Sequence, residues 1–254
     1  MEVVARCDPR GRTILPVVRA SGQLAVRRTG AASVHLVATA FGPLGGDDVQ
    51  IRLVVEAGAR LSVHSVAAAV VLPARGESPP SRQVVHAEVA GVLHLAPEPT
   101  VVTARADHRA ELHAQLSDAA ELTATEQVLL GRVGEEPGRW TGTTRVEQDG
   151  RPLVHTTIGL GPGAPAWLPP VAPRAYVSTV SIGATVSSCA TVSSGATVAA
   201  GDPQRAVATG VDAVRLPLPG GWVGTAWAEE LHEAVTRLAS VTPRTVDERV
   251  EVAR

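Results

Sequence analysis

The sequence of 254 residues carries 23 basic and 25 acidic residues, a formal net charge of -2 and a hydrophobic fraction of 44%. A globular chain of this length buries a substantial core, and the composition lacks both the high charge of disordered proteins and the basic excess of nucleic-acid-binding proteins. Every basic residue is an arginine, which excludes Schiff-base chemistry and P-loop NTPase activity because both need a lysine.

Alternation of apolar and polar residues dominates the first two thirds of the chain. Three segments (50–66, 84–98 and 110–130) each hold two alternating runs around a small or acidic turn, and a fourth (144–157) turns at Asp149-Gly150, a pair suited to a tight hairpin. We predict a hairpin in each segment. Repeated hairpins with little helix between them predict a mainly β fold of stacked antiparallel or mixed sheets, a layered and β-helix-like scaffold.

Two later stretches interrupt this pattern. Residues 159–173 are too rich in proline and glycine for regular structure, which predicts an internal loop or linker. Residues 180–202 contain GATVSS, CATVSS and GATVAA at a six-residue spacing. This repeat fits a coil of a hexapeptide-repeat acyltransferase or, because six is a multiple of two, an ordinary strand. A solenoid needs several stacked units and no other part of the chain continues the repeat, which favours the strand.

The fold is expected to include a short helical portion, with one helix near the C-terminal end of the chain. Residues 227–240 predict it, because they place one apolar stripe at Trp227, Leu231, Ala234, Val235 and Leu238. Glu229 and Glu230 then fall in its first turn and Arg237 in its last, which suits the helix dipole. We expect Pro243 to end the helix.

Residues able to carry catalysis are scarce. The eight histidines show no paired spacing that builds a metal site locally, and no GxSxG motif is present. The two cysteines, Cys7 and Cys189, cannot form a disulfide framework. No export segment is evident, and the longest apolar run, Val66–Leu72, is too short for a membrane span. We therefore expect a cytoplasmic protein with protein partners and no contact with nucleic acid or membrane.

Two acidic positions stand out. Asp47 closes the glycine-rich turn FGPLGGDDV (41–49), where backbone can approach closely beside a carboxylate. Glu126 interrupts the otherwise apolar even-numbered face of residues 122–130. An acid on such a face must be paired, protonated, at a sheet end or lining a cavity, because an unpaired buried charge is costly. A β-bulge would instead turn Glu126 outward.

The order of several motifs resembles the urease accessory protein family UreD, also called UreH. The motifs are GPLGGD (42–47), AGARL (57–61), SVAAAVVLP (65–73), LHLAPEP (93–99), TEQVLLGRVGEE (125–136) and GRPLVH (150–155), followed more thinly by SSGATVAAGD (193–202) and DAVRLPLPGGWVGTAWAEELHEAV (212–235). The hexapeptide repeat falls where the family has a strand, which again favours a strand over a coil.

The resemblance implies a single domain over residues 1–254, built of stacked sheets and without catalysis of its own. Its partners would be the urease apoprotein, a helical UreF-like accessory protein and a UreG-like GTPase, through which nickel reaches urease. The family is thought to hold an internal passage for the metal. By position, Asp47, Glu126 and Glu135 would lie near that passage, with His64 as a further candidate ligand for transient Ni²⁺. No cofactor of its own is implied.

One departure concerns the run Thr-Thr-Pro-Ala-Ala-Thr-Lys-hydrophobic-Tyr-Arg of many family members. This chain has HSVAAAVVLP (64–73) there and lacks the lysine, tyrosine and arginine. The function that the resemblance implies is a urease maturation scaffold that assists nickel insertion. A nickel-independent β-sheet interaction module is the alternative function, and a hexapeptide-repeat acyltransferase is a further one.

Overall fold

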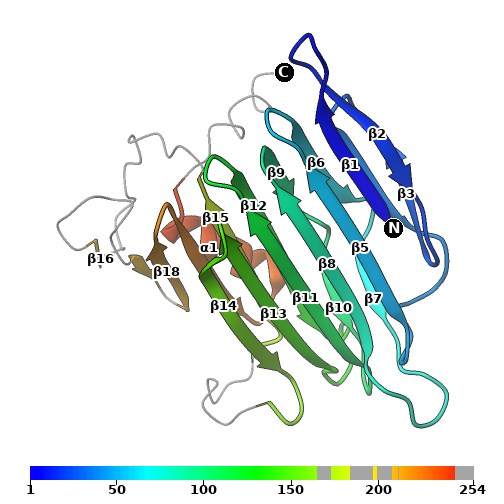
Figure 1. Cartoon of the computed structure of the whole chain (residues 1–254). Helices are drawn as coiled ribbons and strands as arrows, with labels where there is room; N and C mark the ends of the chain where they lie inside the picture. The colour runs from blue at the N-terminus through cyan, green and yellow to red at the C-terminus, as the bar shows by residue number, and fades with distance from the viewer. Residues whose placement is uncertain (165–172, 184–196, 199–207, 211, 244–254) are drawn as a thin grey trace, which may run out of the picture.

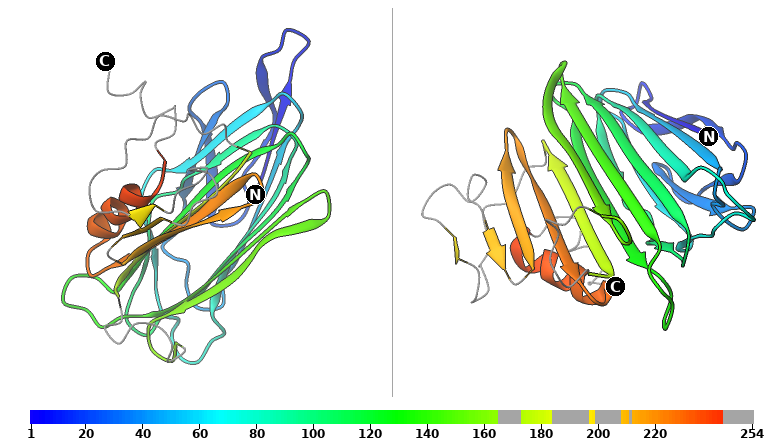
Figure 2. Two further views of the ribbon diagram at one scale, coloured as in Figure 1. Left: turned by 90° about the vertical axis from the view of Figure 1, so that its left-hand side faces the viewer. Right: turned by 90° about the horizontal axis from the view of Figure 1, so that it is seen from below.

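The described part of the chain forms two β-sheets stacked face to face, with one helix (Figures 1 and 2). It is seen in a computed structural model that describes residues 1–164, 173–183, 197–198, 208–210 and 212–243. The mainly β class predicted from the sequence is confirmed.

The strands of the two sheets follow different spatial orders. Sheet A contains, in order, β14 (Arg151–Leu160), β13 (Arg139–Gln148), β11 (Asp107–Leu116), β8 (Ser81–Val89), β5 (Asp48–Val55), β1 (Glu2–Cys7) and β2 (Thr13–Arg19). Sheet B contains β16 (Thr197–Val198), β17 (Ala208–Gly210), β18 (Ala213–Leu218), β19 (Gly221–Ala228), β15 (Ala175–Ile182), β12 (Glu121–Leu130), β9 (Val92–Leu95), β6 (Arg60–Ser65), β4 (Ser33–Ala38) and β3 (Leu24–Arg28), with β10 (Thr100–Val102) and β7 (Ala69–Val71) beside this path.

The chain winds between the sheets as a solenoid-like coil. Strands β5, β8, β11 and β13 run parallel in sheet A, and β4, β6, β9 and β12 run parallel in sheet B. Each pass leaves a strand of sheet A, crosses a short arch, and continues as a strand of sheet B. Alternate residues of both sheets then face each other and form the main core, which includes Leu53, Leu61, Val85, Leu93 and Leu122.

Three of the four predicted hairpins are wrong. Segments 50–66, 84–98 and 110–130 each cross from sheet A to sheet B, so their two strands face each other across the core instead of sharing hydrogen bonds. An arch and a hairpin leave the same alternating apolar pattern, because in both cases the two strands bury a common side. Only 144–157 forms a hairpin, between β13 and β14, with positive φ at Asp149 and Gly150.

Stacked arches approach each other closely at Gly91. Its backbone donates to the carbonyl of Val55 at 3.3 Å, and Val92 donates to Ala59 of the preceding arch at 2.9 Å. A Cβ atom on Gly91 would overlap the carbonyl oxygens of Ala59 and Glu56. Glycine is therefore required here by the contact between successive coils.

The predicted helix is present but begins later than expected. α1 spans Leu231–Val241, whereas Trp227 lies in β19, paired with Tyr176 and packed in an aromatic cluster at a ring distance of 6.1 Å. Glu229 and Glu230 thus precede the helix. Its buried side packs on the outer side of sheet B, over β15, β18 and β19 (Figure 2). The helix ends directly before Thr242 and Pro243, as predicted.

The two irregular stretches fall largely outside the described residues. Of 159–173, the first two residues complete β14 and the next few form a turn. Of the repeat at 180–202, the beginning belongs to β15, which pairs on both sides within sheet B, and Thr197–Val198 forms β16. No helix among the described residues is long and apolar enough to cross a membrane.

Replacing Gly91 by alanine should destabilise the coil, because the added Cβ has backbone on two sides. We expect the free energy of unfolding to fall by at least about 2 kcal/mol in urea denaturation. Gly30→Ala is the control, since its Cβ would meet only Ser33, with the side chain at 3.3 Å and the backbone nitrogen at 3.9 Å. Equal stability of the two variants would contradict the close arch contact.

Candidate functional site

A cavity of about 80 Å³ lies between the two sheets, large enough for several water molecules. Both sheets contribute inward-facing side chains to its wall. Half of the residues that line it are apolar, and the polar ones include Gln83 and Thr144 from sheet A and Glu126 and Ser178 from sheet B. Such a mixture of apolar and convergent polar groups is typical of binding sites.

Glu126 faces the cavity because its strand alternates without interruption. β12 pairs residue by residue with β15 from Leu122 to Leu129, with no bulge, so Glu126 shares its side of the sheet with the buried Leu122 and Val128. Ser178 is its partner on β15. The interior position expected from the sequence is therefore observed.

Burial changes the acidity of Glu126. Loss of hydration raises the pKa of this carboxyl to about 8, and the side chain has no ion pair with any residue that the structure describes. The nearby Glu126 carboxyl also contributes to the raised pKa of the Tyr176 hydroxyl, behind burial itself. At neutral pH the carboxyl is thus mainly protonated.

Sheet B is interrupted beside Glu126. β12 pairs with β9 through residues 121–124 and with β10 through 128–130, which leaves 125–127 without a strand partner on that side. The intervening segment contributes Pro97 and Glu98 to the cavity wall. Glu98 is exposed to solvent as well, so the cavity reaches the surface at this break.

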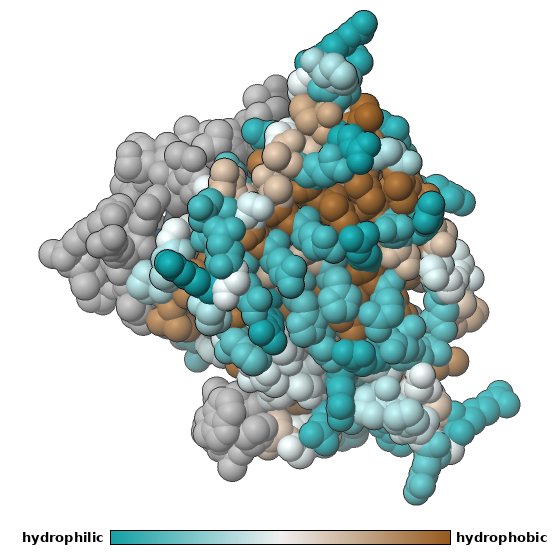
Figure 3. Space-filling view, viewed as in Figure 1, coloured by the Kyte–Doolittle hydropathy of each residue, from teal (hydrophilic) through white to brown (hydrophobic). Residues whose placement is uncertain are grey.

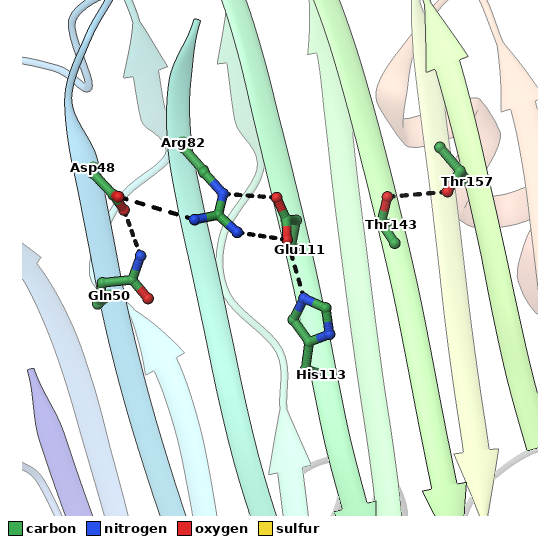
Figure 4. A network of polar contacts seen from close by, with 7 residues as sticks. All are labelled: Asp48, Gln50, Arg82, Glu111, His113, Thr143 and Thr157. Atoms are coloured by element: carbon green, nitrogen blue, oxygen red, sulfur yellow. Dashed lines mark hydrogen bonds and ion pairs between the residues drawn. The ribbon is translucent and has the colours of Figure 1, made fainter. Parts of the chain in front are cut away.

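Carboxylates on the outer face of sheet A contrast with Glu126. That face is largely hydrophilic, with apolar side chains gathered toward the upper right of Figure 3. On this outer face Arg82 donates to both oxygens of Glu111, at 2.7 and 2.9 Å, and His113 lies 3.0 Å from the same carboxylate (Figure 4). The hydrogen bond from Arg82 is the main reason that the pKa of Glu111 falls to about 2.

Asp47 and Glu135 have local partners in turns. Asp47 accepts hydrogen bonds from the Leu44 amide at 2.7 Å and from the Gln23 side chain at 2.8 Å. Glu135 accepts from the backbone and the guanidinium of Arg132, and these hydrogen bonds lower its pKa to about 2. Neither residue is among those that line the cavity.

His64 lies on the other side of sheet B. Leu61 and Val63 of β6 face the core, so His64 points to the outer face. The structure thus places Asp47, Glu126, Glu135 and His64 in four separate surroundings. Within the described ranges, no three histidine, cysteine or acidic side chains converge as a metal site. A shared nickel passage for the four stays a prediction.

Sequence reasoning missed the polar groups opposite Glu126. Ser178 follows the same even-numbered alternation as Tyr176, Val180 and Ile182, so parity along β15 was a usable signal. Gln83 and Thr144 come from sheet A and carry no such signal, because their distance from Glu126 depends on how the two sheets stack.

Comparison with known proteins gives one consistent result. A family model described as UreD urease accessory protein matches residues 1–251. A protein of Frankia alni named urease accessory protein UreD is 38% identical over 232 residues, which cover 83% of this chain and 74% of that protein. Proteins of the same name from Streptomyces avermitilis and Streptomyces coelicolor are 42% and 39% identical, each over 66% of its own length.

Glu126→Gln should change how stability depends on pH. Because the folded state holds the Glu126 proton up to about pH 8 and the unfolded chain only to about 4.5, wild-type stability falls as pH rises through this window. We expect the variant to be more stable than wild type at about pH 9 and similar at about pH 4, measured by urea unfolding.

Glu111→Gln is the matched control with the opposite sign. The lowered pKa of Glu111 adds stability above about pH 4.5 that is lost as pH falls toward 2. This variant should therefore be less stable than wild type at neutral pH and approach it in acid. A pH-independent difference for Glu126→Gln would contradict its burial as an unpaired acid.

Proposed function

Because this chain belongs to the family of UreD urease accessory proteins, we propose that it acts in urease maturation as a scaffold that passes nickel through the cavity between its sheets. The observation that carries the nickel step is the inward-facing carboxyl of Glu126 in that cavity. The scaffold role itself rests on family membership.

The chemistry of the cavity supports brief occupation by a divalent cation. Glu126, Ser178, Thr144 and Gln83 offer oxygen atoms, and oxygen donors hold nickel less firmly than imidazole or thiolate sites do. Entry of the ion into the low-dielectric interior would be coupled to release of the Glu126 proton. Weak, proton-coupled binding suits transfer better than storage.

The break in sheet B gives the ion a way in or out. Glu98 borders the cavity and is exposed, so a second carboxylate stands where the cavity reaches solvent. An ion that passes from Glu98 to Glu126 moves from an exposed carboxyl to a half-buried one. Binding at Glu126 would then select for a cation that can replace the proton of this carboxyl.

The proposed partners are the urease apoprotein, a helical UreF-like protein and a UreG-like GTPase. GTP hydrolysis is assigned to the GTPase, because this chain has no lysine for a P-loop. Exposed apolar residues support contact with proteins: Phe41 is 90% exposed, and Leu44 and Val70 are partly so. The two segments that carry them are adjacent, since Gly45 donates to the carbonyl of Leu72.

Glu126→Gln should reduce nickel-dependent urease activation in cells that express urease with its accessory proteins. We expect a several-fold loss of urease activity, because the amide cannot exchange a proton for the ion. The matched control is Glu121→Gln, on the same strand but facing away from the core. Unchanged activation by Glu126→Gln, with the protein present at wild-type level, would overturn the nickel step.

Phe41→Ser tests the scaffold role separately. We expect this variant of the tagged chain to recover less of the partner proteins on co-purification, because it removes the most exposed aromatic side chain among the described residues. Val235→Ser, which changes an exposed apolar residue on α1, is the control. Recovery of no urease component even by the wild-type chain would favour the nickel-independent interaction module.

A further inference from the structure

Three histidines stand side by side on the outer face of sheet B. His35, His64 and His94 come from β4, β6 and β9, which are parallel neighbours in successive passes of the coil. The ring centroids of His35 and His64 lie 5.3 Å apart, and those of His64 and His94 lie 5.5 Å apart. We call these three residues the histidine row.

The register of the sheet creates this row. His35 and His64 are direct partners in the ladder, and His94 pairs with Ser62, one outward-facing position before His64. Leu36, Val63 and Leu95 face the core, so their histidine neighbours on each strand face outward. The row therefore depends on coil stacking and not on spacing along the chain.

The hydrogen bond of His64 sets which ring nitrogen is available. Its Nδ1 lies 3.3 Å from the carbonyl oxygen of Ala96, and a carbonyl only accepts, so Nδ1 carries the hydrogen and donates. In the neutral ring Nε2 then holds a lone pair. Metal-binding histidines typically donate their other ring N–H to a backbone carbonyl in this way. Nδ1 of His35 lies 2.8 Å from the Thr29 hydroxyl, which can accept a hydrogen bond from it or donate one to it.

The spacing of the rings suits shared ions. A metal–imidazole bond of about 2.1 Å puts the ring centroid about 3.2 Å from the ion, so two rings on one ion have centroids between about 4.5 Å at a right angle and about 6.4 Å in line. The observed separations of 5.3 and 5.5 Å fall inside this range.

We propose that the histidine row forms two overlapping two-histidine sites for a borderline divalent cation such as Ni²⁺, with His64 common to both. Imidazole is a favourable ligand for nickel. No third described side chain converges on either pair, so water would complete the coordination and binding would be weak. A shared central ligand lets an ion move from one pair to the other without full release.

The position of the row gives it a role. His64 contacts Ala96, which directly precedes the Pro97 and Glu98 of the cavity wall. The row thus lies on the outer surface at the break in sheet B, and Glu126 lies on the inner side. The inference that the row loads the cavity rests on the proposed function. The inference that the row binds the ion does not.

A second histidine pair is a weaker candidate. His86 and His113 stack on the outer face of sheet A at 5.3 Å, but Nε2 of His113 is already 3.0 Å from Glu111. Arg52 and Arg145 are ladder neighbours of this pair, and each is already held in an ion pair with a glutamate.

Binding of Ni²⁺ to the purified, tag-free whole chain tests the proposal by isothermal titration. His64→Ala removes both pairs and should lower the affinity by at least about tenfold. His35→Ala and His94→Ala should each lower the affinity less than His64→Ala does. The double variant His35→Ala/His94→Ala should match His64→Ala. His232→Ala, on the exposed surface of α1, should bind as wild type.

Other variants separate this proposal from the cavity site. His64→Asn keeps a donor for the Ala96 carbonyl and replaces His64→Ala if that variant does not fold. Glu126→Gln should retain binding at the row even where it blocks urease activation. Wild-type affinity in a folded His64 variant, or loss of binding in His86→Ala instead, would overturn the histidine row as a metal site.

Discussion

The parallel hydrogen-bond ladders between successive passes of the coil determine every other feature of this molecule. A ladder fixes register, and with a side-chain period of two it also fixes which residues of neighbouring strands face the core. Leu53 in β5 and Ala87 in β8 are such partners, and both are buried. The contact at Gly91 keeps successive arches close enough for these ladders to form.

The same constraint places two similar carboxyls in opposite surroundings. Glu126 faces the cavity and has no ion pair among the described residues, whereas Glu111 on the outer face of sheet A is paired with Arg82. A largely buried carboxyl without an ion pair lowers stability at neutral pH, and a hydrophobic residue would fill its place more favourably. Its presence is understandable if function requires a titratable group in the interior.

Much of the fold followed from the sequence, and the misses have a common cause. Alternation identified the strands and the inward position of Glu126, since both depend on one strand alone. It could not separate an arch from a hairpin, because that choice depends on which backbone accepts the hydrogen bonds of Leu53 or Leu61. The helix began late because Trp227 continues a strand under tertiary packing. The histidine row could not be predicted from the sequence either, because its three members become neighbours only when β4, β6 and β9 pair.

Insertions and deletions would be tolerated unevenly along this coil. β9 and β10 are each registered independently against the single continuous strand β12, so added residues between them, at 96–99, would leave both ladders in place. An insertion within an arch would instead push apart carbonyls that Gly91 already touches. Length variation at 96–99 therefore gives evolution a way to widen, narrow or re-line the opening of the cavity without rebuilding the scaffold around it.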